Sequence, residues 1–372
     1  MKKLLTNVST VCLTAGGAYA GGIDRSGQPI DVLFEEGRYL EFSIVSVSPD
    51  LTGEAVAPFA NGSGSGDIAP SYLRWGAAYK ADLNDRFSYA IILDEPFGAN
   101  TDYAAGTGYF ASTSQADFES RALTGLLQYN MQSGFSVYGG LRLQSIEANA
   151  DVNFIRPVGP PLFYSAETDV HYGLGYVAGV AYERPDIALR VSLTYNSEIG
   201  HDVDTTETTL GVGTLDTSTE FATPQSVNLE FQTGIAANTL LFGGIRWVDW
   251  SDFRLDPSQY ETVTGGAALL SYEEDVITYT LGIGRRLNDN WSLAASVGYE
   301  ENTRNNFTNL GPADGQTSLG LAAIYTQGKY EITAGVRYIR IGDTNTVAGG
   351  FPAAEFDNND ATVFGLKVAY RF

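Results

Sequence analysis

Segments of about ten residues in which apolar and polar side chains strictly alternate recur along this chain. At the end of the chain, every second residue from Phe364 onward is apolar or aromatic, and the last one is Phe372. The same period of two recurs over residues 135–143, 172–182, 187–195, 227–235, 277–283, 291–299 and 330–338. Because successive side chains of a β-strand point to opposite faces, this pattern predicts many strands, each with one apolar face.

Short polar turns and long connections alternate between these segments. The turns lie at residues 83–85, 132–134, 184–186, 237–238, 288–289 and 327–328. The long connections, rich in Gly, Pro, Asp, Asn and Thr, span residues 49–71, 96–119, 147–170, 199–224, 250–273, 302–315 and 342–360. A β-barrel inserted in a membrane with one orientation has short turns on one side and long loops on the other, which gives this alternation along the chain. We therefore predict an all-β fold, a transmembrane antiparallel β-barrel of about 14 strands in the outer membrane of a Gram-negative bacterium.

A soluble β-sandwich also alternates apolar and polar residues, so a second feature has to separate the two folds. Aromatic residues gather near the strand ends on the apolar face, where a membrane barrel carries its interfacial girdles. They are Tyr129, Tyr182, Tyr195, Trp247, Trp291, Tyr299, Tyr325, Tyr330, Tyr338 and Tyr370. This placement favours the membrane barrel. The terminal Phe372 resembles the signal that the outer-membrane assembly machinery reads, so we expect that machinery as a partner.

The first twenty residues have the features of a secretory signal peptide. Lys2 and Lys3 precede a short apolar run, and Ala18-Tyr19-Ala20 supplies the cleavage pattern. The predicted organisation is a signal peptide at 1–20, a short N-terminal plug at 21–38 and the barrel at 39–372. Residues 21–38 are charged and broken by Gly and Pro. They fit either a plug that enters the lumen or a flexible leader.

The net charge and the lack of catalytic motifs disfavour two classes of function, nucleic-acid binding and enzymatic catalysis. The chain has 22 Lys and Arg against 44 Asp and Glu, a net charge of −22, which disfavours nucleic-acid binding. An enzyme is not expected, because the only histidines are His171 and His201 and no Gly-x-Ser-x-Gly elbow occurs. No metal or cofactor is expected either. The stretch Asp357-Asn358-Asn359-Asp360 fits a calcium loop, but a solvated loop explains it equally simply.

Several segments together resemble the FadL/TodX family of outer-membrane channels for long-chain fatty acids and other hydrophobic compounds. The first segment is residues 87–103, in which Pro96-Phe97-Gly98 precedes Thr-Asp-Tyr. The second is Ser-Pro-Asp-Leu-Thr-Gly at 48–53. The others are residues 314–343 and residues 223–253, which contain the spacing of Trp247, Trp250, Ser251 and Phe253. One departure is clear. The family's longer N-terminal hatch contains Asn-Pro-Ala, whereas residues 21–38 are short and lack it.

The resemblance implies a passive channel in which a hydrophobic ligand leaves sideways through a gap in the barrel wall. A gap needs a strand that breaks its ladder, so the predicted lateral opening is Pro96, Phe97 and Gly98. The simpler alternative is that these residues end a strand. The loop at 147–170 is unusually apolar for an external loop, which marks a binding site or inward packing. The predicted apolar ligand contacts are Phe154, Ile155, Val158, Leu162, Phe163 and Tyr164.

A fatty acid carries a carboxylate, which arginine binds well. By strand parity, the predicted contacts in the lumen are Arg142, Arg190, Arg246 and Arg337. Structural ion pairs with lumen carboxylates are the alternative role for them. The other expected partners are outer-membrane lipid and lipopolysaccharide, and we expect a monomer. The rival functions are a general diffusion porin for small polar solutes and a structural or adhesive barrel.

Overall fold

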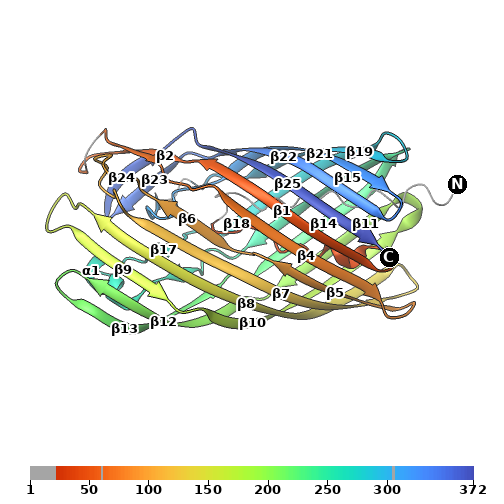
Figure 1. The fold of residues 1–372 in the computed structure, drawn as a ribbon, viewed down its shortest axis with the longest axis horizontal. Coiled ribbons are helices and arrows are strands. Elements are labelled where there is room, and N and C mark those ends of the chain that lie inside the picture. The colour runs from red at the N-terminus through yellow and green to blue at the C-terminus, as the bar shows by residue number, and fades with distance from the viewer. Residues whose placement is uncertain (1–21, 60–61, 304–305) are drawn as a thin grey trace.

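The computed structural model describes residues 22–59, 62–303 and 306–372; the predicted signal peptide lies outside them. Over these residues, fourteen antiparallel strands close into a barrel, as predicted (Figure 1). The strands are β1 (Tyr39–Asp50), β4 (Tyr72–Asp82), β5 (Phe87–Asp94), β7 (Gln115–Asn130), β8 (Phe135–Phe154), β10 (His171–Arg184), β11 (Leu189–Asn196), β14 (Ser226–Ala236), β15 (Thr239–Val248), β18 (Val276–Arg286), β19 (Trp291–Glu300), β21 (Gln316–Gln327), β22 (Tyr330–Ile341) and β25 (Asp360–Arg371).

The first and last of these strands pair with each other and close the barrel. Tyr39 of β1 lies opposite Arg371 of β25, and the ladder runs without interruption to Asp50 opposite Asp360. Each predicted short turn joins two adjacent strands at one end of the barrel, hereafter the turn end. The long connections gather at the other end, hereafter the loop end. Because the first and last strands pair, the sheet has no free first or last edge.

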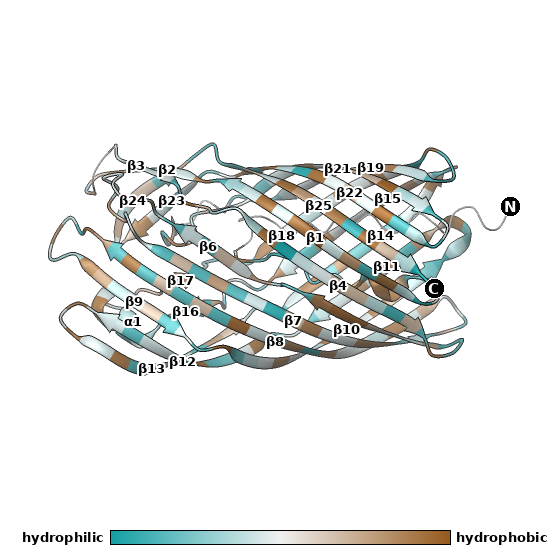
Figure 2. Cartoon of the chain, in the orientation of Figure 1, coloured by the Kyte–Doolittle hydropathy of each residue, from teal (hydrophilic) through white to brown (hydrophobic). Residues whose placement is uncertain are grey.

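The outer face of the barrel carries the apolar residues of the alternating segments. Figure 2 shows hydrophobic and hydrophilic positions alternating along the strands. Aromatic rings pair across neighbouring strands next to the short turns, with centroids 4.7–5.0 Å apart. These pairs are Phe87–Tyr129, Phe135–Tyr182, Trp291–Tyr325 and Tyr330–Tyr370. They form a girdle of the kind found at a membrane interface. Among the described residues, no helix is long and apolar enough to cross a bilayer.

Several strands extend beyond the membrane belt toward the loop end, where their polarity reverses. On β8, Leu143 faces outward, but Glu147 and Asp151, farther along the same side, are charged. The inward side changes in the opposite sense, to Ala150 and Phe154, which are buried. Water replaces lipid outside the barrel at this height, so the apolar side now faces the interior. We call this part of the barrel the collar.

The collar contains strands where the sequence predicted loops. The predicted loop at 147–170 is the end of β8, a turn at 155–161 and β9 (Leu162–Thr168). Likewise, the predicted loop at 199–224 is the hairpin of β12 (Ile199–Thr209) and β13 (Gly213–Thr223), while β11 pairs directly with β14 below it. The predicted loop at 96–119 contains β6 (Gly98–Asp102) and the start of β7. These strands follow the same period of two with the polarity inverted.

The remaining elements fill the loop end. One small sheet contains β2 (Thr52–Ala55), β3 (Gly64–Asp67), β20 (Asn306–Phe307), β23 (Thr344–Ala348) and β24 (Phe351–Phe356). A two-stranded sheet, β16 (Arg254–Leu255) and β17 (Leu270–Ser271), flanks helix α1 (Ser258–Thr264). Two short 3-10 turns, η1 (Asp31–Phe34) and η2 (Pro185–Ile187), complete the fold. Buried aromatic and aliphatic side chains from these loops pack with the collar into one core.

Candidate functional site: a lumen, its N-terminal segment and a break in the wall

The N-terminal segment, residues 22–38, runs through the barrel interior before β1 begins. Two of the arginines predicted to face the lumen hold it there. Arg246 of β15 pairs with Asp24 at 2.6 Å, and Arg190 of β11 pairs with Asp31 at 2.9 Å. In η1, Val32 and Leu33 pack into an apolar cluster formed by the barrel wall. The segment is therefore fixed by buried ion pairs along its polar side and by apolar contacts near the turn end.

The other two predicted lumen arginines have different surroundings. Arg142 of β8 is buried and donates to the Thr124 hydroxyl and the Asn196 side-chain carbonyl, both at 2.9 Å. Arg337 of β22 is half-buried and lies opposite Gly320 of β21. All four predicted arginines thus point inward, and two of them neutralise the N-terminal segment.

The barrel wall is interrupted where β5 gives way to β6. Asp94 of β5 faces Ala122 of β7, and Gly98 of β6 faces Glu119, so residues 95–97 are accommodated opposite only 120–121. This one-residue bulge contains the predicted Pro96-Phe97-Gly98. On the other side, β4 pairs with β5 only from Ala77 onward. Among the described residues, positions 72–76 of β4 have no ladder partner on that side, and β6 pairs with β7 alone.

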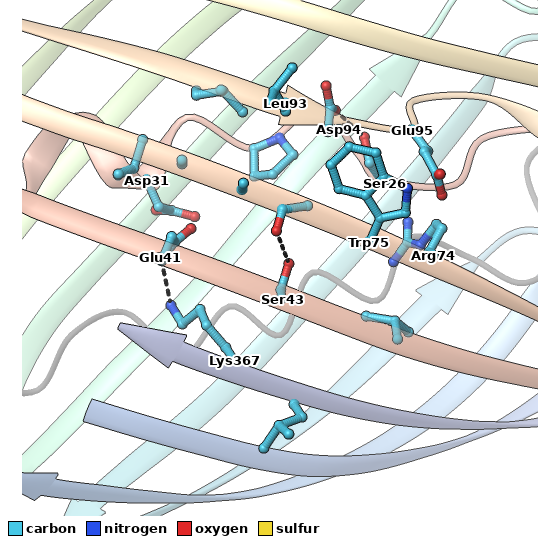
Figure 3. Close-up of a pocket in the computed structure, with 18 of the residues that line it drawn as sticks. Ser26, Asp31, Glu41, Ser43, Arg74, Trp75, Leu93, Asp94, Glu95 and Lys367 are labelled. Atoms are coloured by element: carbon cyan, nitrogen blue, oxygen red, sulfur yellow. Dashed lines mark hydrogen bonds and ion pairs between the residues drawn. The ribbon is translucent and has the colours of Figure 1, made fainter. Parts of the chain in front are cut away.

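A cavity of about 110 Å³ lies at this break. Its lining includes Arg74 and Lys367, which face the lumen, and Trp75, Leu93 and Leu366, which face lipid. Figure 3 shows Arg74 and Trp75 of β4, Leu93 of β5 and Lys367 of β25 gathered there, with Asp94 and Glu95 at the end of β5. Residues from both faces of the wall therefore line one space.

The N-terminal segment is bonded to the bulge itself. The Arg25 amide donates to the Pro96 carbonyl at 2.8 Å, and the Gly98 amide donates to the Ile23 carbonyl at 2.8 Å. Phe97 does not face lipid: its ring is 1% exposed and packs edge-on against Trp250, with centroids 5.8 Å apart. The bulge thus replaces its missing ladder partner on β4 with the N-terminal segment.

A second cavity, of about 50 Å³, lies inside the collar. Its walls are small and apolar, with Ala148, Ala150 and Ala166 beside Phe118 and Phe221. The connection between β15 and β18 covers it with Leu255, Pro257, Leu269 and Leu270. A space bounded in this way binds apolar groups.

The predicted apolar contacts divide into two sets around the collar. Phe154, Leu162 and Tyr164 are buried inside it, whereas Ile155, Val158 and Phe163 are exposed. The buried set belongs to the core that surrounds the second cavity, but none of the six lines that cavity directly. The exposed set lies at or beside the β8–β9 turn. The sequence prediction of a loop assigns no inward or outward face to these residues, so it does not separate the two sets.

Glu207 of β12 anchors the cover of the collar cavity. Its buried carboxylate accepts hydrogen bonds from Thr217 at 2.7 Å and Tyr164 at 2.8 Å, and from the amides of Gln259 and Tyr260 at 3.0 and 3.2 Å. Burial alone would raise the pKa of this carboxyl group, but the hydrogen bonds outweigh it and lower the pKa. The ionised carboxylate therefore caps α1 from another part of the chain.

The two histidines meet at the lower edge of the collar. The Nδ1 atoms of His171 and His201 lie 3.1 Å apart, and the His201 ring stacks on Phe221 with centroids 5.5 Å apart. Burial, and then His171, lower the pKa of His201 to about 4. A neutral imidazole thus packs, at neutral pH, against Phe221, which lines the collar cavity. No set of three His, Cys, Asp or Glu able to hold a metal occurs among the described residues.

The closed barrel, its apolar outer belt and its interfacial girdle define a β-barrel of the outer membrane. The chain belongs to the family described as outer membrane protein transport protein (OMPP1/FadL/TodX), whose model matches residues 33–372. The predicted resemblance is thereby confirmed. The family consists of channels for hydrophobic compounds.

Solved structures share the fold at low sequence identity. A FadL homologue of Pseudomonas aeruginosa is 16% identical, covers 96% of both chains and superposes with a TM-score of 0.75. The toluene transporter TodX of P. putida is 12% identical over 96% of this chain and 97% of its own, with a TM-score of 0.66. The toluene transporter TbuX of Ralstonia pickettii is 14% identical over 96% and 97%, also with a TM-score of 0.66. No curated protein matches the chain.

Proposed function

We propose that this protein is a passive channel that takes long-chain fatty acids from outside the cell and releases them laterally into the outer membrane. The proposal involves no chemical step and no cofactor. The loop end, with its apolar collar, is the entrance. The break between β4 and β6 is the exit.

The wall break is the observation that carries the proposal. A channel that delivered its cargo straight through the lumen would not need a strand interruption at membrane height. Here the ladder between β4 and its neighbour stops, and one cavity is lined by lumen-facing Arg74 and lipid-facing Trp75. A molecule with a hydrocarbon tail gains about 0.8 kcal/mol per CH₂ on leaving water for lipid, so the overall transfer from outside the cell into the bilayer is downhill.

The filled lumen favours a hydrophobic channel over the rival diffusion porin. Porins leave an aqueous pore, whereas residues 22–38 cross this interior and an apolar core closes the loop end. The surface of the collar cavity is mostly apolar, although Thr168, Thr205 and Thr219 contribute to its lining, so it offers a polar solute few hydrogen-bond partners. A molecule that can exchange water for apolar contacts is the better match.

Paired uptake tests the proposal. The full chain is expressed in a bacterium that lacks its own fatty-acid channel, and entry of oleate and of a sugar-sized polar solute is followed in the same cells. The expected result is oleate uptake without sugar entry. Sugar entry without oleate uptake would overturn the proposal in favour of a porin, and entry of neither would exclude both.

A further inference from the structure

We propose that Arg25 is a binding site for the anionic headgroup of the transported molecule, placed in the wall break at the height of the membrane surface. This inference rests on the proposed function and specifies its cargo as a single-chain carboxylate. Arg25 was not among the arginines predicted from the sequence, because it lies in the N-terminal segment and not on a strand.

The Arg25 guanidinium lies in the wall break, between β4 and β6. It stacks over the Tyr72 ring of β4 at 4.2 Å and donates to the Asn100 side chain of β6. A Cβ atom added to Gly98 would collide with the guanidinium carbon. Gly98 and Asn100 lie opposite Glu119 and Asp117 in the ladder, and these two side chains point away from the lumen. The side chain therefore starts inside the barrel and ends in the plane of the wall.

Arg25 is a buried cation without a direct ion pair, although the carboxylates of Glu95 and Asp117 lie near enough to interact with its charge. The residue is only 7% exposed, and its Nε atom has no hydrogen-bond partner. Among the described residues no carboxylate forms an ion pair with it; Asp117 is reached only through the Asn100 amide, which donates to it at 2.5 Å. Carboxylates that are near but not in contact compensate only part of the cost of removing this charge from water, so a carboxylate that contacts the guanidinium is favoured. By contrast, Arg190 and Arg246 already have carboxylate partners.

The surroundings match a molecule with a charged head and an apolar tail. Outward-facing residues of β7 change from Leu123 to Glu119 and Asp117 beside the break, so the membrane surface lies at the height of Gly98. Below it, the break is flanked by Trp75 and Leu93, which face lipid. A carboxylate on Arg25 would remain at the interface while its tail enters the bilayer. A neutral hydrocarbon would leave the guanidinium without a contacting carboxylate.

Ligand binding to the purified full-length protein tests the inference, with palmitate and its uncharged methyl ester as probes. The wild type should prefer palmitate by about ten- to a hundred-fold, the range for hydrogen bonds to a charged group. In Arg25→Gln the affinity for palmitate should fall to that of the ester, and the ester affinity should not change. Gly98→Ala, which displaces the guanidinium without removing it, should have the same effect.

Arg184→Gln is the control, because this exposed arginine lies at a short turn, pairs with Asp186 and should keep the preference for the acid. The folded state of each variant is checked by its heat-dependent electrophoretic mobility. An unchanged acid-to-ester ratio in Arg25→Gln, or the same loss of preference in Arg184→Gln, would overturn the inference alone if the wild type still imports oleate. A wild type that neither binds the probes nor imports oleate would overturn the proposed function as well.

Discussion

Removing the Glu207 carboxylate should release the cover of the collar cavity. In Glu207→Ala the amides of Gln259 and Tyr260 lose their acceptor, and the hydroxyls of Thr217 and Tyr164 lose theirs. Hydrogen bonds to a charged group contribute about 1.5–3 kcal/mol each but are not additive, so we expect α1 to lose about 3 kcal/mol of local stability. Because each 1.4 kcal/mol is a factor of ten, its amides should exchange about 150-fold faster with deuterium.

Hydrogen exchange read by mass spectrometry on the peptide containing α1 measures this effect. Glu220→Ala on β13 is the matched control, because Glu220 is exposed on the same hairpin and lies opposite Asp202, a like charge. That variant should exchange like the wild type. Unchanged α1 exchange in Glu207→Ala would refute the assigned role of the carboxylate, since the helix would then be held by its apolar contacts alone.

Three further predictions concern the same structure. Ala166→Phe fills the collar cavity and should weaken palmitate binding at least tenfold while the barrel still folds, which ligand titration checks. Arg246→Ala leaves Asp24 buried without its ion-pair partner, which should cost about 3–5 kcal/mol of stability and loosen the N-terminal segment. This variant should therefore raise ion conductance in planar bilayers. Arg184→Ala removes only an exposed ion pair and should leave the conductance unchanged. The pKa of Glu207 is lower in the folded chain than its usual 4.5, so the carboxylate stabilises α1 fully above about pH 4.5. This stabilisation is lost as the pH falls through the lower pKa of the folded state. Hydrogen-exchange protection factors of α1, measured on acidification, should show this loss.

The barrel could be predicted from the sequence because its strands obey a simple rule within the membrane. Lipid outside and polar groups inside impose one polarity on every strand, so alternation and turn spacing suffice to place the fourteen strands. The collar obeys the opposite rule. Ala150, Val152 and Phe154 are apolar and point inward while Asp151 points outward, so this stretch lacks the outward-facing apolar residues that identify a membrane strand.

The site was predicted only where local backbone chemistry reveals it. Pro96 and Gly98 mark an interrupted strand in any context, and the structure places the bulge there. The contacts that complete it connect distant parts of the chain: Arg25 with Asn100, and Phe97 with Trp250. No sequence period connects such residues, because their proximity depends on the closure of the barrel. The position of Arg25 in the break therefore depends on the contact between β6 and the N-terminal segment, which the sequence does not predict.

Deleting Pro96 tests lateral release most directly. Without this residue, Glu95 and Phe97 stand opposite Arg121 and Ser120, so β5 and β6 become one continuous strand in register with β7. The repaired strand can then extend its ladder to β4 and close the break.

Oleate uptake by cells carrying the Pro96 deletion is the measurement, with Pro96→Ala as the control that keeps the bulge. We predict that the deletion variant inserts as a folded barrel yet imports no more oleate than cells without the channel, while Pro96→Ala imports it like the wild type. Wild-type uptake through the deletion variant would contradict lateral release, because the cargo would then have another way out of the barrel.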